Sequence, residues 1–109
     1  MTDPDATRAT RDEQLAARFL ADPSVSAGTG FGTSRGLRVD GRIFAIFGDD
    51  RLTLKPPRPR VDALVESGVA TRFDPRGGHP MREWATVGAD RAADWDQLAD
   101  EALAFVRRG

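Results

Sequence analysis

A hairpin signal at Asp40-Gly41 constrains the fold of this chain more than any other feature of its sequence. Apolar residues alternate on both sides of it, at residues 37–39 and 42–47. Both central residues of a type I′ turn need positive φ, which the Asp-Gly pair adopts readily. We therefore predict two antiparallel strands joined by a two-residue loop, with Val39 opposite Arg42 and Leu37 opposite Phe44.

A third strand is expected at residues 51–55, after a turn at Asp49-Asp50. The length of that turn decides which sheet face Leu52 and Leu54 join, because side chains alternate along a strand. A two-residue loop separates them from the core residues of the first hairpin, and a three-residue loop through Arg51 joins them to it. We favour the three-residue loop. The predicted core face then holds Leu37, Val39, Phe44, Ile46, Leu52 and Leu54, and the opposite face holds Arg38, Ile43, Ala45, Phe47, Thr53 and Lys55.

Three segments combine helix start signals with apolar residues at helical spacing. The first opens at Thr10, which has Glu13 at capping-box distance, and the second begins near Pro59, whose fixed φ suits a first helical turn. The third opens at Asp94. Its apolar stripe consists of Trp95, Leu98, Ala99, Ala102, Phe105 and Val106.

Two further strands, at residues 69–73 and 83–87, complete the element order α-βββ-α-ββ-α. This order predicts an α+β fold of two layers, a five-stranded antiparallel sheet with helices against one face. Residues 1–9 lack apolar periodicity and are expected to form a disordered tail, so residues 10–109 form a single domain. The second sheet face stays partly open, and Ile43 and Phe47 there need a cover, either the third helix or a partner.

The composition excludes several classes of site. The chain has no cysteine and one histidine, which rules out disulfides, thiol catalysis and Cys-ligated metals and makes a His-based metal cage hard to build. We expect neither a metal nor a cofactor. No apolar run is long enough to span a membrane, and the polar N-terminus does not resemble a secretion signal, so we expect a cytoplasmic protein.

The best candidate for a functional surface is a set of basic residues. Net charge is -1, yet residues 35–60 carry seven basic and three acidic side chains, or +4. Phosphate binding needs several cations on one surface, although a solvated charged face is the alternative interpretation. Few aromatic residues lie near this set in sequence, so contact with a duplex backbone is preferred over base stacking. The set is Lys55, Arg58, Arg60, Arg72, Arg76 and Arg82.

Other candidates for chemistry have simpler structural interpretations. His79 could act as a base or ligand, but it lies in a Gly-Gly-His-Pro turn with no partner residues identifiable. The glycines of residues 28–32 lack the lysine of a phosphate-binding loop, and Asp49 and Asp50 are typical turn residues. No catalytic constellation is visible, so we expect a protein that is not an enzyme.

Several stretches resemble a known family. Residues 28–32, 36–45 and 51–55 are similar to the opening of the MmcQ/YjbR-like and TfoX N-terminal-domain-like proteins. The later Phe73-Asp74-Pro75, Gly78-His79-Pro80-Met81 and Glu83-Trp84, followed by the helix at 95–106, resemble the MmcQ/YjbR pattern more closely. The similarity spans roughly residues 15 to 107. It implies a compact bacterial α+β domain of a group described as DNA-binding, in which TfoX proteins are associated with competence regulation.

Charge and resemblance together predict a small, non-enzymatic, regulatory domain that binds double-stranded DNA weakly through its phosphates. The alternative is a protein-interaction or small-ligand module. That module would use the open sheet face around Ile43 and Phe47, for another protein or a second copy, together with the loop at residues 73–84.

Overall fold

A computed structural model describes residues 4–28, 35–48, 50–74, 78 and 81–108 of the chain. Within these residues the fold is α+β, as predicted, with one strand more than expected, because residues 25–27 also pair with the sheet. The elements in chain order are α1 (Pro4–Leu20), β1 (Val25–Ala27), β2 (Arg35–Val39), β3 (Arg42–Gly48), β4 (Arg51–Leu54), α2 (Arg58–Glu66), β5 (Thr71–Phe73), β6 (Met81–Gly88), the 3-10 helix η1 (Ala89–Asp94) and α3 (Trp95–Arg108).

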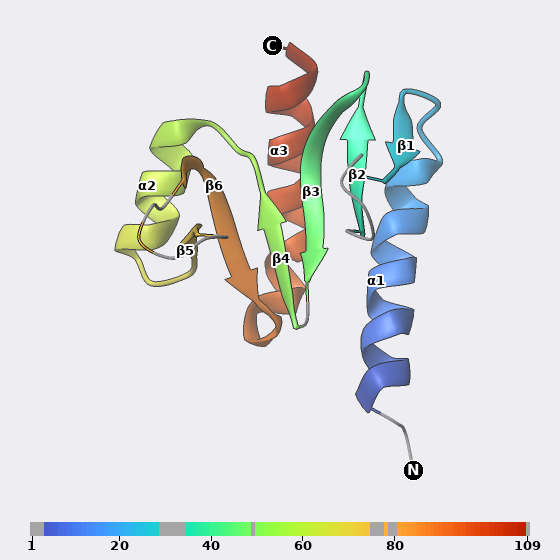
Figure 1. Ribbon diagram of the computed structural model, residues 1–109, viewed down its shortest axis with the longest axis horizontal. Helices are drawn as coiled ribbons and strands as arrows, with labels where there is room; N and C mark the ends of the chain where they lie inside the picture. Colours follow the sequence, from blue (N-terminus) through green and yellow to red (C-terminus); the bar gives the residue numbers. More distant parts are fainter. Residues whose placement is uncertain (1–3, 29–34, 49, 75–77, 79–80, 109) are drawn as a thin grey trace.

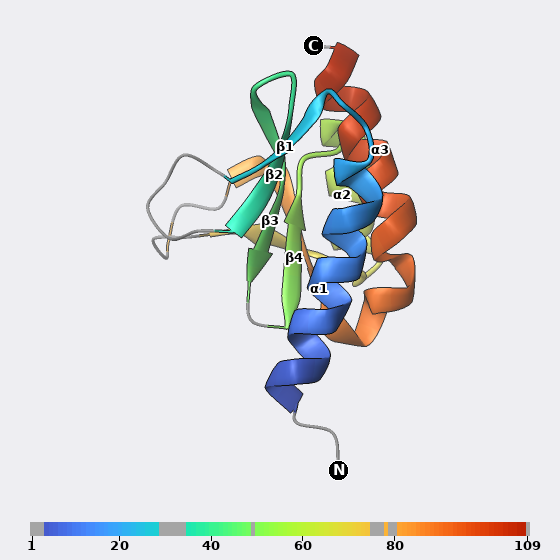
Figure 2. The ribbon, with the colours of Figure 1, turned by 90° about the vertical axis from the view of Figure 1, so that its right-hand side faces the viewer.

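The sheet has six antiparallel strands in the order β1-β2-β3-β4-β6-β5. Figure 1 shows α3 running behind the sheet, between α1 and α2, and Figure 2 shows all three helices on the same side. The opposite surface carries no helix of the described residues. We call it the helix-free face; its residues include Arg38, Ile43, Ile46, Thr53, Lys55, Phe73, Trp84 and Thr86.

The first hairpin forms as predicted at its turn but not along its length. Val39 pairs with Arg42, and Asp40 and Gly41 both have positive φ, at 51° and 83°. Leu37, however, pairs with Ala45 instead of Phe44, because a β-bulge inserts one extra residue into β3.

The second turn is shorter than predicted. Gly48 pairs with Arg51, so the loop has two residues and not three, and Asp50 there adopts a φ of 54°. A two-residue loop with positive φ matches the twist of the flanking strands. Phe47 therefore lies opposite Leu52.

The bulge and the short loop have opposite effects on the core. The bulge moves Ala45 and Phe47 to the side of the helices, where Phe47 packs against the core, and it moves Ile46 to the helix-free face opposite Thr53. The prediction that Ile46 lies on the core face is thus wrong, and so is the prediction that Ala45 and Phe47 lie on the open face. Since the two-residue loop then pairs Phe47 and Ala45 with Leu52 and Leu54, both leucines are buried in the core as predicted.

The helices supply the other half of the core. α1 begins at Pro4 and not at Thr10, so residues 4–9, predicted as part of a disordered tail, are helical; proline is favoured in a first helical turn. The predicted stripe of α3 is buried except for Phe105, which is 39% exposed. None of the helices in the described part of the chain is long and apolar enough to cross a membrane.

Candidate functional site

The structure divides the predicted basic set. Arg60 on α2 directs its Nε to Oε1 of Glu101 on α3 at 3.1 Å, and Arg72 on β5 directs its Nη2 to Oδ1 of Asp62 on α2 at 2.7 Å. Each of these two charges therefore has a carboxylate partner among the helices. Arg58 and Arg82 are exposed, Lys55 lies on the other side of the sheet, and Arg76 is outside the described residues. The set does not form one cationic surface.

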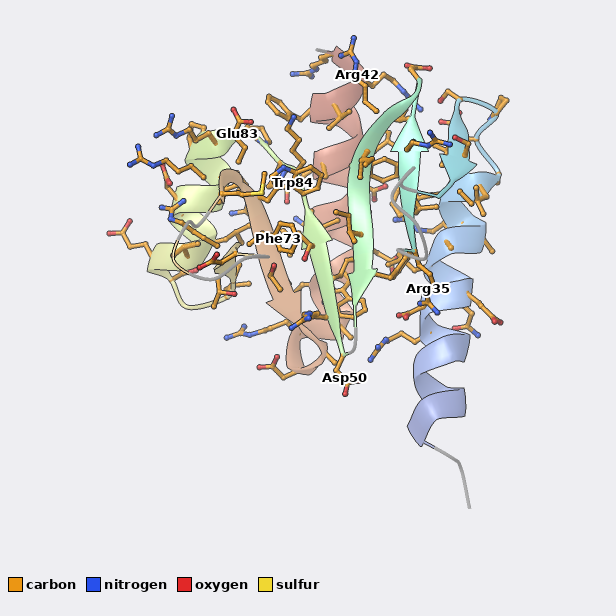
Figure 3. All side chains as sticks on the ribbon, in the orientation of Figure 1. Arg35, Arg42, Asp50, Phe73, Glu83 and Trp84 are labelled. Atoms are coloured by element: carbon orange, nitrogen blue, oxygen red, sulfur yellow. The ribbon has the colours of Figure 1, made fainter. Side chains whose placement is uncertain are left out.

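Lys55 has aromatic neighbours instead. It directly follows β4, and its Nζ lies 5.9 Å from the centroid of the Trp84 ring on β6. The Phe73 ring on β5 lies 6.4 Å from the same ring, tilted by 57°. Figure 3 shows Phe73 and Trp84 together on the helix-free face. Both rings are half-buried, so each keeps part of its surface in contact with solvent.

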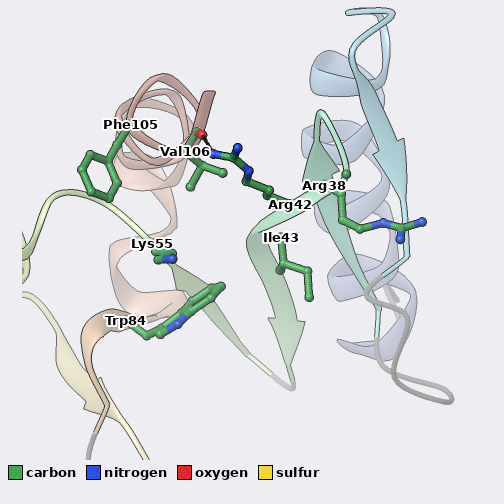
Figure 4. Close-up of a pocket in the computed structure, with 8 residues that line it drawn as sticks. Arg38, Arg42, Ile43, Lys55, Trp84, Phe105 and Val106 are labelled. Atoms are coloured by element: carbon green, nitrogen blue, oxygen red, sulfur yellow. Dashed lines mark hydrogen bonds between the residues drawn. The ribbon is translucent and has the colours of Figure 1, made fainter. Parts of the chain in front are cut away.

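Lys55 and Trp84 border a cavity of about 520 Å³ (Figure 4). Trp84 and Lys55 line it on the sheet, and Phe105 and Val106 close it at the last turn of α3. Arg42 lies across this end and donates from Nη1 to the carbonyl oxygen of Val106 at 3.4 Å, a long hydrogen bond. The remaining lining residues are Arg38, Gly41 and Ile43.

Arg38 and Lys55, the cations that line this cavity from the helix-free face, form no ion pair with any described residue. Several arginines on the helix side are paired with carboxylates: Arg11 and Arg35 with Asp12, Arg18 with Asp96 and Asp100, Arg60 with Glu101, and Arg107 with Asp22. The charges of Arg38 and Lys55 therefore remain available to an external anion.

Sequence reasoning found part of this site. It placed Arg38, Ile43 and Lys55 on the open face, and the structure places them there. It included Phe73 and Trp84 only as the ends of the loop at residues 73–84 in the alternative function, and it did not place their rings beside Lys55. They lie there because β6 pairs with β4 across the intervening α2 and β5. The alternation of side chains along β6 was the signal that could have placed Trp84. Ala85 and Val87 are buried against the helices, so Trp84 and Thr86 lie on the opposite face.

The predicted partner surface around Ile43 and Phe47 needs a correction. Only Ile43 lies on the helix-free face. Phe47 faces α1, with the guanidinium of Arg35 5.6 Å from its ring centroid, and it lines a separate cavity of about 380 Å³ beside Ala16. The bulge in β3 moves Phe47 from the predicted open face to the side of the helices.

The remaining sequence candidates add no chemistry to the site. His79, Asp49 and residues 29–32 lie outside the described residues. Asp50 lies 3.8 Å from Arg11 across the end of the sheet. Within the described ranges, no three acidic or histidine side chains are grouped to hold a metal ion.

A half-buried aromatic ring beside an unpaired ammonium group suits a ligand that is planar and anionic, because the ring stacks and the cation attracts negative charge. Comparison of the chain with protein-family models, with curated proteins and with solved structures finds no match.

Proposed function

We propose that this chain is a small, non-enzymatic domain that binds single-stranded nucleic acid on its helix-free face. The observation that carries the proposal is the position of the Lys55 ammonium group over the Trp84 ring. A cation beside a stacking platform provides the two contacts that unpaired nucleotides need, one for phosphate and one for a base.

The choice of a single strand follows from the aromatic neighbours of Lys55. The sequence favoured a duplex because few aromatic residues lay near the basic set, and two rings now adjoin its first member. Bases in a duplex already stack on one another and cannot reach Trp84 without unpairing. Arg60 and Arg72 are paired with carboxylates, which removes two of the phosphate contacts that duplex binding was expected to use.

A small anionic ligand is the second candidate, favoured by the cavity of about 520 Å³ beside Trp84. This volume is within the usual range for small-molecule sites. A mononucleotide that binds as tightly as an oligonucleotide would favour this candidate.

The test is the affinity of the protein for a fluorescent ten-nucleotide oligothymidylate at low salt. Loss of one stacked base costs about 1–3 kcal/mol, so we expect Trp84→Leu to weaken binding about 5- to 150-fold. Lys55→Gln should weaken binding and make it less salt-dependent, because each phosphate contact adds about -0.7 to the salt slope.

Arg91→Gln is the matched control. Arg91 is an exposed arginine on η1, away from the helix-free face, and its loss changes the net charge by the same amount. Thermal unfolding confirms that each variant is folded. Tighter binding to a duplex of mixed sequence, or equal losses in Lys55→Gln and Arg91→Gln, would contradict the proposal.

A further inference from the structure

A row of five side chains crosses the helix-free face, four of them from strands and one, Lys55, from the residue that directly follows β4. Arg38 on β2 pairs with Ile43 on β3, and Phe73 on β5 contacts Trp84 on β6. Lys55 lies between these pairs, because it follows Leu54, the last residue of β4, and approaches Trp84. The row thus runs across the β-strands in the order Arg38, Ile43, Lys55, Trp84, Phe73.

The chemistry of the row changes along its length. Two aromatic rings occupy the β5 end, a cation lies in the middle, and a second cation lies at the β2 end. In Figure 4 the Arg38 guanidinium points away from Trp84, which extends the row toward β1. The Nε of Arg38 is buried and has no hydrogen-bond partner among the described residues.

An anionic chain that leaves Lys55 has two directions open to it. Toward α3 it meets the apolar side chains of Phe105 and Val106, and Arg42 there donates a hydrogen bond to the carbonyl oxygen of Val106. Toward β2 it passes Ile43 and reaches Arg38, which has no carboxylate partner among the described residues. The second direction is therefore favoured for phosphates.

Resting on the proposed function, we infer that a single strand lies along this row, with bases on Trp84 and Phe73 and with its backbone passing Lys55 toward Arg38. The row spans four inter-strand steps of about 4.8 Å, roughly 19 Å in all, or about three extended nucleotides of ~6 Å each. Arg38 thus binds a phosphate of the strand, and the length of the row sets how many nucleotides the site accommodates.

The experiment is a series of oligothymidylates of one to eight nucleotides, titrated against intrinsic tryptophan fluorescence. Trp84 is the partly exposed tryptophan, while Trp95 is only 1% exposed, so stacking reports on Trp84. We expect affinity to rise steeply up to three or four nucleotides and only slowly beyond. Arg38→Gln should weaken binding of the four-nucleotide and longer chains about 3- to 10-fold and leave the mononucleotide unchanged.

The outcomes separate this inference from the proposed function. An Arg38→Gln effect no larger than that of Arg91→Gln overturns the row while single-strand binding at Trp84 stands. Quenching by all lengths with equal affinity, the mononucleotide included, favours the small anionic ligand and overturns single-strand binding as well. Absence of quenching and of binding at every length overturns both.

Discussion

At the scale of single residues, the two tryptophans show how position within an element decides what a side chain does. Trp95 opens α3, is 1% exposed, and donates from Nε1 to the carbonyl oxygen of Gly88 at 3.2 Å. Its indole ring packs in the core, and its one polar group, the Nε1–H, has a hydrogen-bond partner. Trp84 lies at an alternate position of β6 from buried Ala85, so its ring reaches the helix-free face.

Among the residues that the structure describes, Asp22 is the one whose pKa is most strongly perturbed. The backbone N–H and then the hydroxyl of Ser24 donate to it, and Arg107 from the end of α3 adds a third contact, which together lower its pKa from 3.8 to about 2. A carboxylate with a lowered pKa in the folded state stabilises the protein above its unfolded pKa, and that contribution is lost as pH falls.

Asp22→Asn should therefore lower the melting temperature at pH 7, and the difference from wild type should shrink as pH falls from about 4 to about 2. Melting curves of both proteins at pH 7, 4 and 2 check this. A difference that is the same at all three values would show that the charge of Asp22 is not the cause.

At the scale of elements, one bulged residue decides which side chains meet the core. Phe44 is fully buried and packs edge-on against Phe19 of α1, with ring centroids 5.6 Å apart. Side-chain alternation without a bulge cannot bury both Phe44 and Ala45, yet both lie against the helices. The pattern of apolar residues identified the strands and the first turn, because these depend on local φ and periodicity. It could not identify the bulge, since a bulge is stabilised by the helices that pack on it.

The register of β3 and β4 makes a direct prediction for stability. Leu52→Ala removes a fully buried side chain and should cost about 2–5 kcal/mol of unfolding free energy, whereas Ile46→Ala on the helix-free face should cost about 1 kcal/mol. Urea denaturation of the two variants gives both values. Equal losses of unfolding free energy in the two variants would instead support the register predicted from the sequence, in which Ile46 lies in the core.

At the scale of the whole molecule, the two sides of the sheet differ in how their charges are used. Ion pairs tie the helices together, as where Arg18 of α1 reaches Asp96 and Asp100 of α3 at 2.7 and 3.2 Å. Such exposed pairs contribute little stability, about 0–1 kcal/mol each, but they neutralise the arginines involved. Arg38 and Lys55 face the other way, and the near-neutral net charge conceals this asymmetry.

The sequence predicted less of the site than of the fold, and the reason is distance along the chain. Arg38 and Ile43 belong to one hairpin, so local alternation placed them on the same face. Trp84 and Lys55 lie side by side because β4 pairs with β6, although α2 and β5 separate these two strands in the sequence. Contacts of this kind carry no short-range signature.

Binding at Trp84 can be observed through the two indole N–H resonances of a ¹⁵N-labelled sample during titration with a four-nucleotide oligothymidylate. We expect the resonance of partly exposed Trp84 to shift with ligand concentration, while that of Trp95, hydrogen-bonded inside the core, stays in place. Trp84→Phe assigns the two signals. Saturable binding that leaves the Trp84 resonance unmoved would contradict the claim that the helix-free face is the binding site.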